Sequence, residues 1–223
     1  MEEGVKLKLS PSSLSVMRAC PRCFWLQMNG PKEPAGFPMA ILNVFDAVEK
    51  NYYDKYRKEG LPPMLKGKIP LKLVDQKTAE KLRKYLIWED TETGAVLRGK
   101  MDDCFIDNKG TLVVMDNKTR SGDFKEIYEN YLFQLDTYAF LLEKNGYKVA
   151  DKGYIIYFQP DKGSDLDKGV KFSTDPKVVK LNPNRVIGVF REAVKIAKQK
   201  KAPEHHKECE TCLWINKIRE LEL

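Results

Sequence analysis

The chain has 223 residues, of which 42% are hydrophobic and 32% are charged, and its formal net charge is +7. That length is enough for one domain with a sizeable hydrophobic core, and no apolar run approaches the roughly 18 residues of a membrane-spanning helix, so no membrane association is expected. The basic excess favours a polyanionic partner such as nucleic acid, although a solvated lysine-rich surface has the same composition.

The amino-terminal sequence, MEEGVKLKLS, lacks the apolar core of a secretion signal, so we expect a cytoplasmic protein. Five cysteines in such a chain indicate metal binding more than a disulfide framework. The cysteines are therefore candidate ligands rather than candidate crosslinks.

Hydrophobic spacing and capping residues predict mainly helices in the first third of the chain. The expected helices span residues 10–20 with Ser10 or Ser12 as N-cap, a short piece within 21–38, residues 39–58 and residues 76–87. The helix over 39–58 is clearly amphipathic, and a stretch rich in Gly and Pro at 60–70 ends it.

From residue 95 onward the hydrophobic pattern becomes that of strands. The expected elements are strands at 95–106 and 111–118 joined by a turn at 107–110, a helix at 123–144, strands at 153–158 and near 168–173, and a helix at 183–199. A tail bearing Cys and His follows. This order predicts an α/β fold, with a central mixed sheet flanked by helices in a single domain over residues 1–223.

An acidic pair and a lysine stand out in the predicted hairpin. Residues two apart in a strand share a face, so Asp116 and Lys118 project together beyond Leu112 and Val114, and the hairpin brings Asp102 close to them. Two close carboxylates repel each other, and a hard cation such as Mg²⁺ or Mn²⁺ removes that cost. The pattern therefore predicts a metal site in which the lysine orients water, with a surface salt bridge on a hairpin edge as the alternative.

Three motifs in order resemble the RecB-like branch of the PD-(D/E)XK nuclease superfamily. They are GKMD at residues 99–102, DNKT at 116–119 and QLDTY at 134–138. The resemblance covers roughly residues 10–215. It implies a restriction-endonuclease-like core over about 39–199 and hydrolysis of DNA phosphodiester bonds.

The resemblance also implies roles for individual residues. The expected catalytic residues are Asp102, Asp116, Lys118, Gln134 and Tyr138. The two aspartates and the backbone carbonyl of Asn117 would bind Mg²⁺ or Mn²⁺. Gln134 and Tyr138 are four apart on one helical face and would position the substrate, with a half-buried helix boundary as the alternative.

The early helix departs from the family pattern. Active members of this branch carry a His there as a further metal ligand, but Phe45 or Asp46 stands at that place in this chain. Asp46 or Glu49 is a candidate substitute, and for each a solvated charge is the alternative. The departure puts the strength of catalysis in question.

Two Cys-x-x-Cys pairs lie near the two ends of the chain, at Cys20 and Cys23 and at Cys209 and Cys212. Together they predict a four-thiolate site that joins the terminal segments 10–30 and 203–216, with two unrelated pairs or one redox pair as alternatives. The residues around Cys20 resemble the start of iron–sulfur-bearing RecB-like nucleases, including CRISPR-associated exonucleases and recombination nucleases. That resemblance favours a [4Fe-4S] cluster, and tetrahedral Zn²⁺ satisfies the same ligands.

The expected function is a metal-dependent exonuclease acting on single-stranded DNA or DNA ends in repair, recombination or CRISPR adaptation, with a possible protein partner there. Arg22, Lys100 and Arg120 are candidate phosphate contacts. The alternative function is a catalytically weak or inactive nuclease-fold module that binds DNA or docks to a partner.

Overall fold

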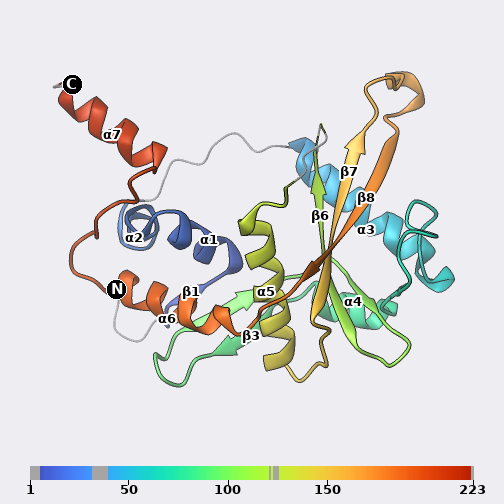
Figure 1. Cartoon of the computed structure of the whole chain (residues 1–223), viewed down its shortest axis with the longest axis horizontal. Coiled ribbons are helices and arrows are strands. Elements are labelled where there is room, and N and C mark those ends of the chain that lie inside the picture. Colours follow the sequence, from blue (N-terminus) through green and yellow to red (C-terminus); the bar gives the residue numbers. More distant parts are fainter. Residues whose placement is uncertain (1–5, 32–39, 121, 123–125, 222–223) are drawn as a thin grey trace.

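The computed structural model describes residues 6–31, 40–120, 122 and 126–221, and its strands form two separate sheets (Figure 1). The larger sheet has the order β2-β5-β6-β7-β8. Its strands are β2 (Lys72–Leu73), β5 (Cys104–Ile106), β6 (Leu112–Thr119), β7 (Lys152–Pro160) and β8 (Phe172–Lys180). Only β6 and β7 pair in parallel, and the other neighbours in this sheet are antiparallel. The sheet is therefore mixed, as predicted.

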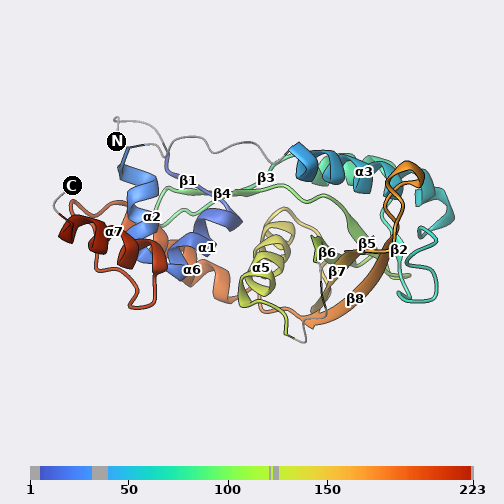
Figure 2. The ribbon, with the colours of Figure 1, turned by 90° about the horizontal axis from the view of Figure 1, so that it is seen from above.

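The smaller sheet has the order β1-β4-β3. Its strands are β1 (Lys8–Leu9), β4 (Val96–Gly99) and β3 (Leu86–Glu89). Helix α5 (Glu129–Lys144) connects β6 to β7 and contacts β6 in one sheet and β3 and β4 in the other (Figure 2). Nine residues of α5 are buried, among them Leu135, Ala139 and Leu142, so this helix lies in the core between the sheets.

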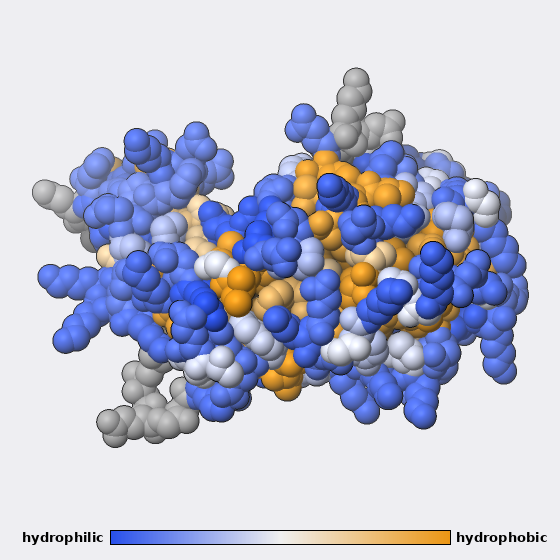
Figure 3. Space-filling model, turned by 60° about the horizontal axis from the view of Figure 1, so that its bottom comes forward, coloured by the Kyte–Doolittle hydropathy of each residue, from blue (hydrophilic) through white to orange (hydrophobic). Residues whose placement is uncertain are grey.

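The remaining helices lie at the two ends of the molecule (Figure 1). At one end are α1 (Pro11–Ala19), α2 (Pro21–Asn29), α6 (Arg185–Ala197) and α7 (Glu210–Glu220), and at the other are α3 (Ala40–Tyr56) and α4 (Gln76–Leu82). Short 3-10 turns occur at η1 (Arg57–Glu59) and η2 (Leu166–Lys168). On the face shown in Figure 3, hydrophilic residues cover much of the α2–α7 end and hydrophobic residues gather over the middle.

The alternation of side chains along β6 sets the two faces of the larger sheet. Leu112 and Val114 belong to the core that contains α5, whereas Val113 and Met115 belong to a second core that contains Tyr53 of α3. Because the strand period is two, the polar residues that follow divide between the same two sides. Two helices therefore approach the end of β6 from opposite faces.

The prediction of a single strand at 95–106 is wrong, because this segment forms two strands that belong to different sheets. The chain leaves β4 after Gly99 and enters β5 at Cys104. Between them, the Met101 N–H donates to the Leu82 carbonyl at 3.0 Å, and Arg83 donates to the Asp102 carbonyl at 3.0 Å. Hydrogen bonds to a distant segment thus replace the ladder at the break.

Other boundaries differ from the prediction. The helix expected at 76–87 stops with α4 at Leu82, and β3 begins at Leu86. The helix expected at 123–144 begins at Glu129, and residues 123–125 lie outside the described part of the chain. The late strand starts at Phe172, and the tail contains α7. Ser10, one of the two predicted candidates, is the N-cap of α1.

Within the described residues, no helix is long and apolar enough to cross a membrane.

Candidate active site and cysteine group

A chain of polar contacts runs from β6 to α5. The Lys118 ammonium pairs with Asp116 Oδ2 at 2.6 Å and donates to Gln134 Oε1 at 3.0 Å. The Gln134 amide then donates to the Tyr138 hydroxyl at 3.1 Å. The Lys118 ammonium also lies 4.6 Å from the centre of the Tyr131 ring. Four of the predicted catalytic residues are therefore linked, and the lysine has a defined position.

Asp102 lies beside this chain of contacts. Strand β5 begins at Cys104, which pairs with Val114 of β6, so Asp102 lies in the break just before that strand. Burial raises the pKa of Asp116, the Lys118 charge opposes that rise, and the negative charge of Asp102 adds to it. The two aspartates thus lie within electrostatic reach of each other.

A lysine that the sequence analysis did not select approaches the same carboxylates. Lys50 of α3 pairs with Asp102 Oδ1 at 2.9 Å and with Asp46 Oδ2 at 2.7 Å. The spacing of Asp46 and Lys50 is the usual i, i+4 helical ion pair, which is the only sequence signal for this lysine. Asp46 is therefore engaged with a cation of its own helix.

Glu49 is the helix carboxylate that faces the site. Burial raises its pKa from 4.5 to about 7, a hydrogen bond with Asn117 opposes that rise, and the charges of Asp102, Asp46 and Asp116 add to it. Its Oε1 atom is buried without a hydrogen-bond partner. Of the two substitutes considered for the missing His, Glu49 is thus the one near both aspartates.

Asn117 points to the α3 side of the sheet, as the alternation along β6 requires. Its side-chain oxygen accepts a 2.9 Å hydrogen bond from the Tyr53 hydroxyl, and Tyr53 is fully buried. This contact fixes the backbone between Asp116 and Lys118, including the carbonyl predicted as a metal ligand. Tyr53 therefore supports the site and is too enclosed to stack with a base.

A buried ion-pair network holds the segment that carries Asp102. Asp103 has a fully buried side chain that accepts from Arg57 at 2.6 Å and from Arg83 at 3.3 Å. Both arginines also pair with Asp54, and together they lower its pKa to about 2 against the effect of burial. Because Arg83 also binds the Asp102 carbonyl, the network positions that aspartate.

The three predicted phosphate contacts lie in different places. Arg120 follows the site on β6, pairs with Asp175 and stacks 4.0 Å over the Tyr157 ring. Lys100 is exposed, and its ammonium lies 4.4 Å from the Tyr85 ring centre. Arg22 lies on α2 and donates to the Pro203 carbonyl at 2.9 Å, beside the cysteines. The structure therefore does not gather these three residues in one patch.

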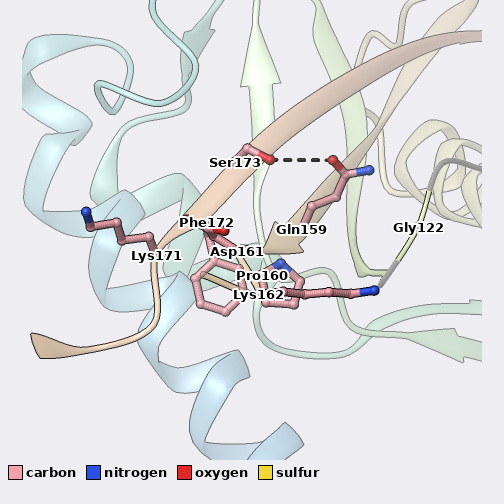
Figure 4. Close-up of a pocket in the computed structure, with 8 residues that line it drawn as sticks. All are labelled: Gly122, Gln159, Pro160, Asp161, Lys162, Lys171, Phe172 and Ser173. Atoms are coloured by element: carbon pink, nitrogen blue, oxygen red, sulfur yellow. Dashed lines mark hydrogen bonds between the residues drawn. The ribbon is translucent and has the colours of Figure 1, made fainter. Parts of the chain in front are cut away.

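A hollow of about 520 Å³ lies at the end of β7 and the start of β8 (Figure 4). Gln159 and Pro160 line it and follow Tyr157, which pairs with Lys118. Lys162 and Lys171 also belong to its lining. The hollow thus continues from the strand end that carries the polar site and brings two lysines to it.

The four predicted cysteines come together at the other end of the molecule. Cys20 and Cys209 are the N-caps of α2 and α7, and Cys23 and Cys212 lie three residues further on. Their four sulfur atoms all lie within 4.8 Å of one another. Within the described residues, this is the one group of three or more His, Cys, Asp or Glu with ligand atoms so close.

The electrostatics of the cysteine group favour a thiolate. Burial opposes ionisation of Cys20, but hydrogen bonds from the backbone N–H groups of Cys23 and His206 and from neighbouring thiols outweigh it and lower its pKa to about 6. Burial is the main cause that raises the pKa of Cys212 to about 11. Cys104 is buried in β5, apart from this group. The four cysteines form a site that can bind a metal.

Residues 32–216 match the model of the PD-(D/E)XK nuclease superfamily. The chain belongs to that superfamily, which confirms the predicted resemblance, and its members are nucleases that use divalent metals. A solved structure titled "Crystal structure of SSO0001" is 17% identical with a TM-score of 0.46, over 97% of this chain and 86% of that one. No curated protein matches.

Proposed function

We propose that the protein is a deoxyribonuclease that hydrolyses phosphodiester bonds with Mg²⁺ or Mn²⁺. The observation that carries the proposal is the linked arrangement of Asp116, Lys118 and Gln134 beside Asp102. A purely structural role does not require a lysine held between a buried carboxylate and a glutamine amide. Membership of the nuclease superfamily supports the same reaction.

The residues present suit a hard divalent cation. Asp102 and Asp116 are the proposed ligands, with the backbone carbonyl of Asn117, and Glu49 supplies a third carboxylate in place of the absent His. Each negative charge raises the pKa of a neighbour, so a cation among them would relieve a real electrostatic cost. When bound, the ion supplies Lewis acidity and a more acidic water.

Lys118 has the role of orienting the attacking water and stabilising negative charge that develops on the phosphate. Gln134 holds the ammonium through its side-chain oxygen, and Tyr138 holds the Gln134 amide. Gln134 and Tyr138 therefore act as positioning residues in this proposal. Their spacing of four places both on one side of α5, toward β6.

The proposed substrate is single-stranded DNA or a DNA end, and the proposed mode is exonucleolytic. The hollow beyond β7 offers Lys162 and Lys171 to a phosphate backbone, and Phe172 in the same lining stacks 4.9 Å from Phe45. Lysines and aromatic rings at this end of β7, next to the proposed active site, suit the binding of flexible single-stranded DNA. Repair, recombination and CRISPR adaptation are the pathways proposed from the resemblance.

One observation favours the second candidate, a DNA-binding or partner-docking module with little activity. The Lys50 ammonium pairs with Asp102, so it neutralises one of the proposed ligands. Among the described residues, the acidic side chains also form no close group of three or more ligands such as the cysteines form. For Asp102 to bind a metal ion, its carboxylate would thus have to give up the ion pair with Lys50.

Cleavage of end-labelled single-stranded DNA with Mn²⁺ tests the two candidates. The wild type should cut, Asp116→Asn and Lys118→Ala should not, and Lys180→Ala, on an exposed lysine at the far end of β8, should cut like the wild type. Cutting by both site variants would overturn the assignment. DNA binding without cutting by any form would support the module instead.

A further inference from the structure

The spacing of the four cysteine sulfurs is that of a single metal ion. Cys23 Sγ lies 3.5 Å from both Cys209 Sγ and Cys212 Sγ, and Cys20 Sγ lies 3.9 Å from Cys212 Sγ. In a tetrahedral zinc site with metal–sulfur bonds of about 2.3 Å, neighbouring sulfurs are about 3.8 Å apart. These three separations lie close to that edge length, and all four sulfurs lie within 4.8 Å of one another.

A cube-shaped iron–sulfur cluster requires its cysteine sulfurs to lie further apart. Each cysteine there binds a different iron, and the irons and sulfides stand between the thiolates, so the cysteine sulfurs lie roughly 6 Å apart. All four sulfurs here lie within 4.8 Å of one another. The family resemblance and the geometry of this chain therefore point to different metals.

The backbone around the site suits a compact thiolate group. Each Cys-x-x-Cys pair occupies the N-cap and the third residue of a helix, so the two pairs stand at equivalent helix positions. Helix N-termini carry partial positive charge from free N–H groups, which stabilises the negative charge of four thiolates on a divalent ion. The five cysteines are free rather than joined in disulfides.

We propose that Cys20, Cys23, Cys209 and Cys212 bind one tetrahedral zinc ion instead of an iron–sulfur cluster, and that this ion attaches α7 to α2. Cys212 is the buried residue of α7, while Leu213 and Trp214 beside it are exposed. The helix thus has little apolar contact to hold it, and the ion supplies the attachment.

Metal content and X-ray absorption test the identity of the ion. The protein is purified without oxygen from cells supplied with both iron and zinc. We expect about one zinc per chain, four sulfur neighbours at about 2.3 Å and no metal–metal distance. Several irons per chain with acid-labile sulfide and a metal–metal distance would overturn the proposal, and so would four cysteines in disulfides without metal.

Matched cysteine variants test the ligands. Cys209→Ser and Cys212→Ser should each lower zinc content at least severalfold, whereas Cys104→Ala should keep it, because Cys104 lies outside the group. Zinc content that is unchanged in both serine variants would overturn the ligand set. Asp116→Asn should also keep the zinc, so this proposal and the proposed nuclease function can fail separately.

Hydrogen exchange tests the attachment. Removing zinc with a chelator should raise amide exchange across residues 210–220 at least tenfold and leave β6 and β7 unchanged. Unchanged exchange in 210–220 would overturn the attachment. Equal acceleration in β6 and β7 would overturn it too, because the ion would then support the whole fold.

Discussion

Lys118 of β6 donates a 3.0 Å hydrogen bond to Gln134 of α5, sixteen residues further along the chain. The parallel pairing of β6 with β7 requires a crossover, and α5 is that crossover, so the same connection that builds the sheet places the glutamine over the lysine. The contacts continue from Gln134 to Tyr138. Lys118, Gln134 and Tyr138 should therefore contribute to cleavage in decreasing order, as their distance from the reacting phosphate increases.

Substitutions along this line should therefore give graded effects on kcat. Lys118→Ala should lower kcat at least about 100-fold, Gln134→Ala about tenfold, and Tyr138→Phe about twofold. The effects decrease because Gln134 acts only by holding Lys118, and Tyr138 acts only by holding Gln134. Single-turnover cleavage measures the step directly. A loss in Tyr138→Phe equal to that in Lys118→Ala would contradict the order.

Asp102 and Asp103 are neighbours that should contribute very unequally to stability. Asp103→Ala leaves Arg57 buried without its main partner and should cost roughly 3 to 5 kcal/mol of unfolding free energy. Asp102→Asn removes a half-exposed ion pair and should change stability by less than about 1 kcal/mol while abolishing cleavage. Urea unfolding of both variants measures the difference, and equal destabilisation would contradict the role of the network.

The strand that carries the site could be predicted because its signals are local. Leu112 to Met115 form an uninterrupted apolar run, and the preceding turn ends in Gly110, whose positive φ of 77° favours glycine. Asp107 accepts hydrogen bonds from the backbone of Lys109 and Thr111, as turn aspartates do. The cysteine group could be predicted for a similar reason. Each Cys-x-x-Cys pair is visible within four residues of sequence, and a site with four ligands needs both pairs.

The break before Asp102 and the choice of Glu49 could not be predicted. The break is set by Arg83 and Leu82, which contact it from another segment. Gly99, Asp102 and Asp103 interrupt the apolar pattern there, but they do not show that the two halves join different sheets. Asp46 and Glu49 are three apart and share a helical side, so only the packing of α3 on the sheet decides which faces Asn117.

Glu49 should make the metal-free protein less stable as pH rises. Its pKa is about 7 in the folded chain against an ordinary 4.5, so the folded state holds the extra proton between these values and stability falls as pH increases through that window. From pH 5 to pH 8 the wild type should lose about 2 kcal/mol more than Glu49→Gln.

Urea unfolding in a chelator for divalent metals, at several pH values, measures that difference. Asp116 also has a raised pKa but is present in both proteins, so its contribution cancels. Parallel stability curves for the wild type and Glu49→Gln would show that Glu49 does not hold a proton in this window.

Lys50 should compete with the divalent ion for Asp102. Its ammonium pairs with that carboxylate at 2.9 Å, so Lys50→Met should free the ligand and lower the dissociation constant for Mn²⁺ severalfold. Lys55→Met on the same helix is the control, because Lys55 is exposed and its ammonium lies over Tyr56. Titration of free Mn²⁺ by electron paramagnetic resonance measures binding without relying on cleavage. Weaker Mn²⁺ binding in Lys50→Met would mean instead that the lysine organises the acidic residues for the metal.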